Sequence, residues 1–572
     1  MVLSSIRMSS LKHRDSGMDN KEIEPDNSGV AVYPASINTN AKDGKFTTTK
    51  VEHRSFESYH VNLLAIGGTI GTAVFVYLGE GLTSGGPLNL LLAFIWWVSV
   101  VWAVAECQKE LVVQWPTDTA FSRHAARYAD EAAGFALGWN FYFLDMALAI
   151  FEVTACSVVL SYWKSAADLN DAVIISIVIG TYAVLNLWDS RYFANAEFAL
   201  AVGKILLIIG LLLMTFVTML GGNPIHDRFG FRFWKEPGPL TGPYPDNPVG
   251  LNRFQGFISC LIVAAFAVGG PEYLSVVCGE ARNPRKTMPT AFNATIYRLV
   301  IFFIGSALAI GILVPYNDPN LLGAQADGAA GAAKSPYVIA MNRLQIPVLP
   351  HIVNGAIFSS VLSAGNAYFF CASRALAQMA RDGHAPGFLN KRNRNGVPYP
   401  SVIVCLCLLL LAYTQVSSSA SVLIDYLTSI SSSAQLVNWI VFSFVWIKWY
   451  QANKVQGISR DTLPCRSPFQ PYAAYYALFC STLVTLIQGY EVFLTDNWDT
   501  ANFFFSYGMP ILYTILFVGF KLIKKTKWET SKSADVTSLY DDPEFTEFID
   551  YAAMDKRGRF GNLVHKVLKA LF

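Results

Sequence analysis

The chain has 572 residues, of which 53% are hydrophobic and only 15% charged, with a formal net charge of +2. This composition excludes an ordinary soluble protein, and the near-neutral charge gives no reason to expect a nucleic-acid partner. A helix needs about 20 apolar residues to cross the hydrocarbon core of a bilayer. By that measure the sequence predicts about twelve membrane-spanning helices between residues 59 and 523.

Three regions follow from this pattern. Residues 1–55 are polar and predict a disordered cytoplasmic tail, 56–525 form the membrane body, and 526–572 form a C-terminal cytoplasmic tail. We expect both tails to be accessible to ubiquitin-ligase machinery.

The orientation follows from the basic residues, which gather on alternating loops. Loop 221–253 is also basic but must lie outside, and we follow the majority because long loops obey the positive-inside rule weakly. The basic loops, and with them both termini, are therefore placed in the cytoplasm. These loops carry Lys109, Arg123 and Arg127; Arg282, Arg285 and Lys286; Arg381, Lys391, Arg392 and Arg394; and Lys454, Arg460 and Arg466.

The first span is interrupted by the sequence GGTIGT at 67–72. Glycine weakens a helix, and unwound backbone at membrane depth is tolerated where it lines a cavity or is buried in protein. The freed N–H groups and the positive end of the next half-helix suit a carboxylate, and the freed carbonyls suit an ammonium group. The alternative is that Gly67 and Gly71, four residues apart, let two helices pack closely. The candidate binding residues here are Gly68, Thr69, Ile70, Gly71 and Thr72.

A second interruption, Gly269-Gly270-Pro271-Glu272, breaks the sixth span, and two such breaks at the heads of two sets of about five spans indicate an inverted-repeat transporter. Phe266, just before this break, is either an aromatic cover for the bound substrate or an ordinary core residue. Glu272 must face a cavity, pair with another group or be protonated, because a carboxylate at this depth costs about 2.5–3.5 kcal/mol. We expect Gly270, Phe266 and Glu272 to contact the substrate.

Two further spans carry ionisable residues. Asp145 and Glu152 lie seven residues apart in the third span and so share one helix face, which predicts a polar pathway, a proton relay or a cation partner. Alternatively, one of them lies near a helix end and is hydrated. Lys204, in the fifth span, could gain and lose a proton during transport if its ammonium is unpaired. It could also extend to the cytoplasmic edge.

The sequence offers nothing for enzymatic chemistry. The nine cysteines include no C-x-x-C pair and are interpreted as small core residues. A phosphate-binding P-loop and a Ser/His/Asp or Cys/His constellation are both missing from the sequence. We therefore expect a protein that is not an enzyme and that uses no cofactor or metal.

Motifs along most of 56–525 resemble those of the fungal amino-acid permeases, the yeast amino acid transporter family within the amino acid–polyamine–organocation superfamily. The resemblance implies an all-α fold of the LeuT type, with helices 1–5 and 6–10 as inverted repeats and two extra helices. It also implies proton-coupled uptake of amino acids at the plasma membrane. The motifs are GGTIGTAVF (67–75), GFALGWN (134–140), AAFAVGGPE (264–272), GEARNPRKTMP (279–289), LVPYNDPNLL (313–322), SPYVIA (335–340), VLSAGNA (361–367) and GVPYPSV (396–402).

Site residues are implied by the same resemblance. The backbone at 68–71 would hold the carboxylate and amine of the substrate, and Phe266 would be the aromatic lid. Glu152 and Glu272 match the acids of the family's third and sixth helices, and Lys204 matches the fifth-helix lysine seen where sodium sits in sodium-coupled relatives. The chain departs from the family at Asp145, where an apolar or aromatic residue is usual, and at PTDTAF (116–121), where P-V-S-G-S-F is more common.

The substrate is indicated by three short segments. Gly270-Pro271-Glu272 in place of the commoner G-T-E, together with 350–354 and 412–419, resembles the proline and γ-aminobutyrate branch. This favours proline or another small neutral amino acid, although Asp145 and Glu152 leave a cationic substrate open. The predicted function is proton–amino-acid symport by alternating access. Its alternatives are a non-transporting sensor of the same fold and an exchanger without proton coupling.

Overall fold

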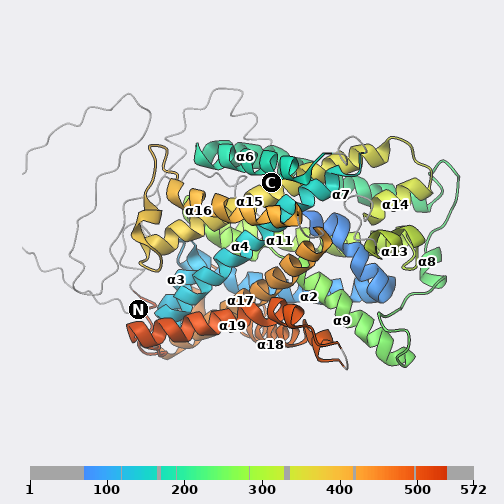
Figure 1. The fold of residues 1–572 in the computed structure, drawn as a ribbon. Coiled ribbons are helices and arrows are strands. Elements are labelled where there is room, and N and C mark those ends of the chain that lie inside the picture. The colour runs from blue at the N-terminus through green and yellow to red at the C-terminus, as the bar shows by residue number, and fades with distance from the viewer. Residues whose placement is uncertain are drawn as a thin grey trace, which may run out of the picture. The chain divides into compact units, whose positions relative to one another are not determined.

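The computed structural model describes residues 70–537 except 118, 164–168, 189, 282–283, 327–334, 417–419 and 495–496, and every regular element in these residues is helical (Figure 1). The predicted N-terminal tail and residues 538–572 of the predicted C-terminal tail lie outside the described residues. Within the described part, nine helices are long and apolar enough to cross a membrane, and two more apolar helices are shorter.

The first long helix contains two spans. Helix η1 (Ala73–Tyr77) continues into α2 (Leu78–Gln114), which is kinked at Gly86, where φ is 80° and ψ is 171°. Only glycine adopts this backbone readily, and Pro87 follows it. The kink also contacts the 221–253 loop, because the Leu88 N–H donates to the Pro239 carbonyl at 2.9 Å. When the long helix is counted as two spans, one on each side of Gly86, the number of apolar helices in the described residues agrees with the predicted total of about twelve spans.

The second predicted break is present where the sequence placed it. Helix α9 (Val249–Ala267) ends before Val268, and α10 (Pro271–Val277) begins with proline at its first position. Gly270 lies between them with a φ of 134°, a conformation that a residue with a Cβ rarely adopts.

The remaining helices complete two successive sets. The second set opens with the broken pair α9 and α10. The first opens with η1, and residues 67–69 of the first predicted break lie outside the described residues. The first set is completed by α4 (Glu131–Leu160), α6 (Asp171–Leu187) and α7 (Ser190–Met219). The second set is completed by α11 (Pro284–Arg298) with η3 (Leu299–Ile304) and α12 (Gly305–Leu313), then α15 (Leu349–Arg381), α16 (Tyr399–Leu409) with η6 (Leu410–Val416), and α17 (Ala420–Val455). The two additional helices are α18 (Tyr472–Ile487) and α19 (Thr500–Lys524).

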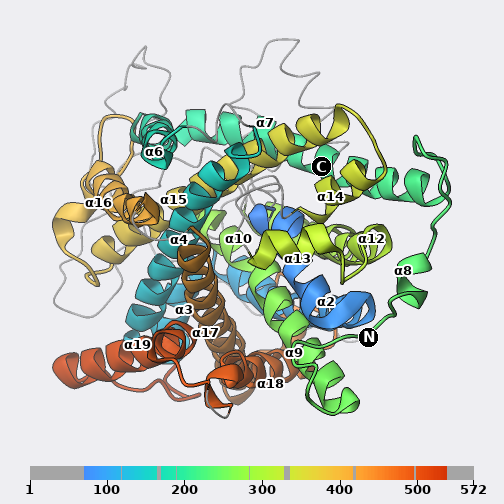
Figure 2. The ribbon, with the colours of Figure 1, turned by 45° about the vertical axis from the view of Figure 1, so that its right-hand side comes forward.

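Short helices lie in the connections: α3 (Ala120–Tyr128), α8 (Arg232–Lys235), η2 (Cys278–Glu280), α13 (Pro319–Ala326), α14 (Pro336–Arg343), η5 (Gly387–Asn390), η7 (Arg460–Thr462) and η8 (Tyr490–Phe493). The most extensive packing joins equivalent parts of the two sets, α4 along α15 and α2 along α9. In Figure 2, α10 lies among these helices, with α4 and α15 on one side and α2 and α12 on the other.

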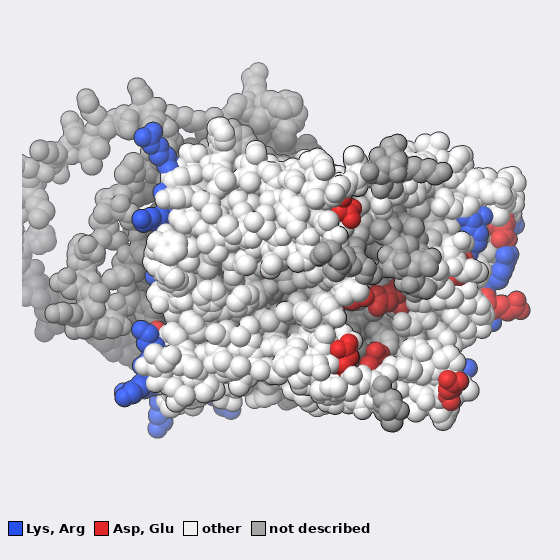
Figure 3. Space-filling view, in the orientation of Figure 1, with Lys and Arg blue, Asp and Glu red and all other residues white. Residues whose placement is uncertain are grey.

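Lysine and arginine gather along one end of the described surface, at the left edge of Figure 3, where α3 and the end of α19 lie. The chain after α19 returns to this end. Lys521 and Thr526 both donate to the carboxylate of Asp130, and Arg127 pairs with Asp535 at 2.7 Å. Residues 526–537 of the predicted C-terminal tail are therefore packed against the ends of α3 and α4.

Candidate functional site

A small cavity lies where the start of η1 and the break between α9 and α10 meet α4, α15 and α17. Its volume of about 20 Å³ leaves room for about one water molecule, so an amino acid fits only after the surrounding groups move apart. The wall is mainly apolar and aromatic, and Glu152 contributes a carboxylate. The lining residues are Gly71, Ala73, Leu148, Phe151, Glu152, Phe266, Ala267, Gly269, Tyr273, Tyr368 and Gln435.

Glu152 is hydrogen-bonded to Thr72, the last residue of the first predicted break and the residue directly before η1. Its Oε1 accepts a hydrogen bond from the backbone N–H of Thr72 at 3.2 Å, and its Oε2 accepts one from the Thr72 hydroxyl at 2.6 Å. Gly71 permits this approach, since a Cβ at that position would lie 2.1 Å from Oε1 of Glu152 and 3.0 Å from the Cβ of Ala364. The third span and the first break, predicted separately, therefore form one site.

The backbone of the first break is partly engaged by the protein itself. The Ile70 carbonyl accepts a hydrogen bond from the Ser360 hydroxyl at 3.1 Å, and the Thr72 N–H is held by Glu152. Gly68 and Thr69, which were also predicted to bind substrate, lie outside the described residues. A substrate carboxylate could take over the N–H of Thr72 only if Glu152 moved or changed its protonation state.

Phe266 lies on the cavity wall within a cluster of three rings. Its ring is 5.1 Å from that of Tyr77 and 5.4 Å from that of Phe151, both in edge-on contact. Tyr77 also interacts electrostatically with Glu80 and Asp425, which are both exposed. Tyr77 therefore connects this aromatic cluster to two acids at the surface, and the role of Phe266 as a cover over the substrate stays a prediction.

Glu272 is fully buried and held by neutral donors. Its Oε1 accepts hydrogen bonds from the Gln435 amide at 2.8 Å and from the Gly270 N–H at 3.1 Å. Its Oε2 accepts one from the Trp439 indole at 3.3 Å. Glu272 does not line the cavity; Gln435, which sequence reasoning missed, lies on the wall in front of it.

Lys204 is paired, which corrects the expectation of an unpaired ammonium. Its Nζ lies 3.8 Å from Oε1 of Glu197, and its side chain is fully buried, so it does not extend to the cytoplasmic edge. Both carboxylate oxygens of Glu197 accept from the Ser363 hydroxyl at 2.8 Å, which ties α7 to α15. Lys204 is also within electrostatic range of Glu152. Glu152, Lys204 and Glu197 are therefore neighbouring ionisable groups carried by α4 and α7.

Sequence reasoning did not identify Glu197, although the signal was present. Glu197 precedes Lys204 by seven residues and so shares its helix face, by the same argument that joined Asp145 to Glu152. Tyr273, Tyr368 and Gln435 carried no comparable signal, because aromatic and amide residues are common in packed membrane helices. Among the described residues, no group of three His, Cys, Asp or Glu side chains could hold a metal ion.

The family model described as "Amino acid permease" matches residues 60–532. The chain belongs to this family. It is therefore a multi-pass membrane transporter of amino acids rather than an enzyme.

Several curated relatives share most of its length. The general amino acid permease AGP2 of Saccharomyces cerevisiae is 40% identical over 84% of this chain and 80% of that protein. The dicarboxylic amino acid permease of the same yeast is 35% identical over 88% of this chain and 83% of that protein. A proline-specific permease of Emericella nidulans is 34% identical over 86% of this chain and 89% of that protein.

A crystal structure of a mutant manganese transporter of Eremococcus coleocola is similar in fold. Its TM-score is 0.52 at 14% identity, and the match covers 82% of this chain and 94% of that one. At this identity the likeness shows the fold alone, the LeuT-type arrangement of five plus five helices.

Proposed function

We propose that this permease takes up amino acids across the plasma membrane together with protons, by alternating access, with both termini in the cytoplasm. The basic end of the described surface supports this orientation by the positive-inside rule (Figure 3). The bilayer would surround the spans, and contact of the tails with ubiquitin-ligase machinery remains a separate prediction that falls mainly outside the described residues.

The observation that carries the proposal is the double contact between Glu152 and Thr72. As a carboxylate, Glu152 accepts from both the N–H and the hydroxyl of Thr72. A proton on Glu152 would convert one acceptor oxygen into a donor and release part of this hold on the first broken helix. Because a substrate carboxylate would use the same backbone, proton binding and substrate binding would favour the same rearrangement.

In this proposal, the positive charge of Lys204 balances the negative charge of the ionised Glu152. Paired with Glu197 and within range of Glu152, it would stabilise the ionised form of Glu152 after the proton leaves. The small apolar cavity, and relatives that are named proline-specific, support proline or another small neutral amino acid as substrate.

The test is uptake of radiolabelled proline, alanine, arginine and glutamate by permease-deficient yeast cells expressing the full chain. Each is measured at acidic and at neutral pH, with and without a protonophore. Concentrative, acid-stimulated and protonophore-sensitive uptake is expected. Exchange that the protonophore leaves unchanged would favour the exchanger, and absence of all uptake by protein at the cell surface would favour the sensor.

Two variants test the coupling groups. Lys204→Met and Glu152→Gln should each reduce concentrative uptake and flatten its pH dependence. Lys454→Met, which changes an exposed lysine near the end of α17, is the matched control and should behave as wild type. Wild-type pH dependence in Lys204→Met would remove that residue from the coupling mechanism.

A further inference from the structure

Asp145 is a buried carboxyl group that the proposed coupling mechanism does not use. It lies on α4, seven residues nearer the start of the helix than Glu152, and has no exposed surface. Neither of its carboxylate oxygens has a hydrogen-bond partner among the described residues. The charged group identified as acting on it is Glu272, which carries the same sign. This differs from Glu152, Glu197 and Glu272, each of which is held by donors.

The position of Asp145 is just beyond one wall of the cavity. Leu148, one helical turn away on α4, lines the cavity together with Tyr273 and Tyr368. Both tyrosines are within electrostatic range of Asp145, and their ring centroids are 5.6 Å apart. The two rings, from α10 and α15, therefore lie both on the cavity wall and in the neighbourhood of the carboxyl group.

A carboxyl group in this position requires a partner. Left ionised and unpaired at membrane depth, it is costly, and even in the protonated form its buried O–H and carbonyl oxygen would lose their hydrogen bonds. An inorganic cation is not supported, because the described residues offer no cluster of three metal-ligating side chains. An organic ammonium or guanidinium group brings both the opposite charge and several N–H donors.

The spacing along α4 limits the length of such a ligand. A rise of ~1.5 Å per residue places Asp145 about 10 Å from Glu152 along the helix axis. A ligand whose α-amino and α-carboxyl groups lie at the two broken helices can reach Asp145 only with a long side chain. Lysine, with a four-carbon stem, and arginine have this shape, whereas proline and alanine do not.

We propose that Asp145 forms a subsite for the distal cation of a basic amino acid, entered when the rings of Tyr273 and Tyr368 move apart. This inference rests on the proposed amino-acid transport and extends its substrate range. Small neutral substrates occupy the cavity between the broken helices, and basic substrates extend past the two rings. Asp145 is thus a specificity-determining residue.

The experiment compares lysine with norleucine, which has the same straight chain without the terminal amine. Uptake by permease-deficient yeast is measured for the wild type, Asp145→Asn and Asp246→Asn, the last being an exposed acid on the 221–253 loop. Asp145→Asn keeps the size of the side chain and removes its charge. The KM for lysine should rise about tenfold or more, as expected when one partner of a buried charge pair is truncated. The KM values for norleucine and proline should change less than about twofold, and Asp246→Asn should match wild type.

A second measurement needs no variant. In wild-type cells, lysine should inhibit proline uptake at lower concentration than norleucine does. Equal inhibition by the two, or parallel changes in their KM values in Asp145→Asn, would overturn the subsite. Proline transport without any uptake or inhibition by lysine would overturn the subsite but leave amino-acid transport intact. Failure of the wild type to transport any amino acid would overturn the proposed function itself.

Discussion

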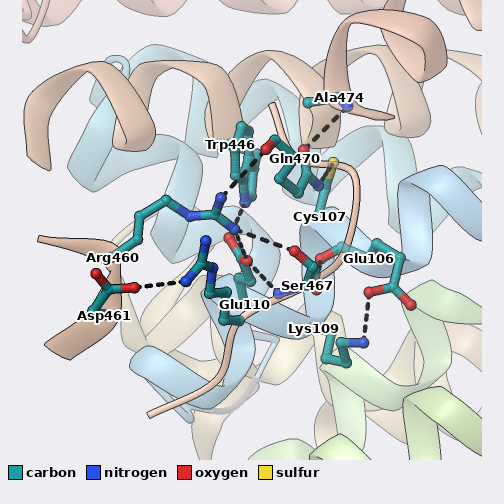
Figure 4. Close-up of polar contacts among 11 residues, drawn as sticks. Glu106, Cys107, Lys109, Glu110, Trp446, Arg460, Asp461, Ser467, Gln470 and Ala474 are labelled. Atoms are coloured by element: carbon teal, nitrogen blue, oxygen red, sulfur yellow. Dashed lines mark hydrogen bonds and ion pairs between the residues drawn. The ribbon is translucent and has the colours of Figure 1, made fainter. Parts of the chain in front are cut away.

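The ion pair between Glu110 and Arg460 is the more deeply buried of the two described ion pairs made by the loop that joins α17 to α18, so breaking it should be costly. Glu110, at the end of α2, is only 1% exposed, and Figure 4 shows Arg460 reaching it from the loop. Arg460 Nη2 lies 2.5 Å from Oε1 of Glu110. The Ser467 N–H donates to the same oxygen at 2.6 Å, and the Trp446 indole donates to Oε2 at 2.9 Å.

Replacing Arg460 with methionine would leave the carboxylate of Glu110 buried without a counter-charge. Breaking a buried pair in this way costs about 3–5 kcal/mol, and the two neutral donors that remain place the expected cost near ~3 kcal/mol. For a chain of this length, an unfolding entropy of ~2.1 cal/mol/K per residue sums to about 1 kcal/mol/K, so the Tm should fall by roughly 2–3 °C.

The assay is thermal unfolding of purified protein in detergent. Arg466→Met is the matched control, because Arg466 pairs with Asp461 at 2.6 Å while the two side chains are 62% and 76% exposed, a pair worth about 1 kcal/mol at most. The double variant Glu110→Gln with Arg460→Met should lose less stability than the two single losses added together. A drop in Arg460→Met no larger than that of the control, or strict additivity in the double variant, would refute the reasoning.

Two further predictions concern the site and the end of α4. Gly71→Ala would place a Cβ 2.1 Å from Oε1 of Glu152, and overpacking of this kind costs about 1–3 kcal/mol. Uptake by protein at the cell surface should therefore fall roughly tenfold to a hundredfold. Gly210→Ala is the control: its Cβ would meet nothing within 4 Å, so it should retain wild-type uptake. Burial opposes ionisation of Asp130, but hydrogen bonds led by that from Lys521 outweigh it and hold the pKa of Asp130 below its usual value. The ionised Asp130 therefore stabilises the folded state fully at pH values above the ordinary pKa of an aspartate. This stabilisation is lost as the pH falls through the lowered pKa of Asp130 in the folded protein. Lys521→Met should lower the Tm at neutral pH and weaken the acid dependence of the Tm, and an unchanged profile would contradict the assignment.

The parts of the fold that could be predicted from sequence are those set by local chemistry. Apolar runs predicted the spans because each helix must satisfy its own backbone hydrogen bonds in lipid. The break at Gly269-Gly270 could be predicted because glycine and proline act on the backbone where they stand. The merging of two spans across Gly86 was not predicted, since a kink changes direction without interrupting the apolar pattern.

Contacts between distant residues could not be predicted in this way. Glu152 and Thr72 are 80 residues apart, and nothing in either local sequence says that one holds the other. The same is true of Glu272, whose two side-chain donors come from α17, and of the Ser363 hydroxyl that holds Glu197. Burial of Lys204 was one of the two alternatives that the sequence left open, and its pairing was missed because Glu197 was not considered with it.

The sequence by itself therefore determined that this protein spans a membrane, that the helix at Gly269-Gly270 is broken, and which ionisable residues lie at depth. The first predicted break, at 67–72, lies partly outside the described residues and stays a prediction. The sequence could determine these features because hydrophobicity, glycine and proline act locally, and because every charge in lipid is costly wherever it lies. Only the tertiary structure decided how those charges are used. Glu152 holds the first break, Lys204 is paired, Glu272 lies behind Gln435, and Asp145 has no partner among the described residues. These outcomes depend on how α4, α7, α15 and α17 pack around the broken helices, which hydrophobic patterning leaves open.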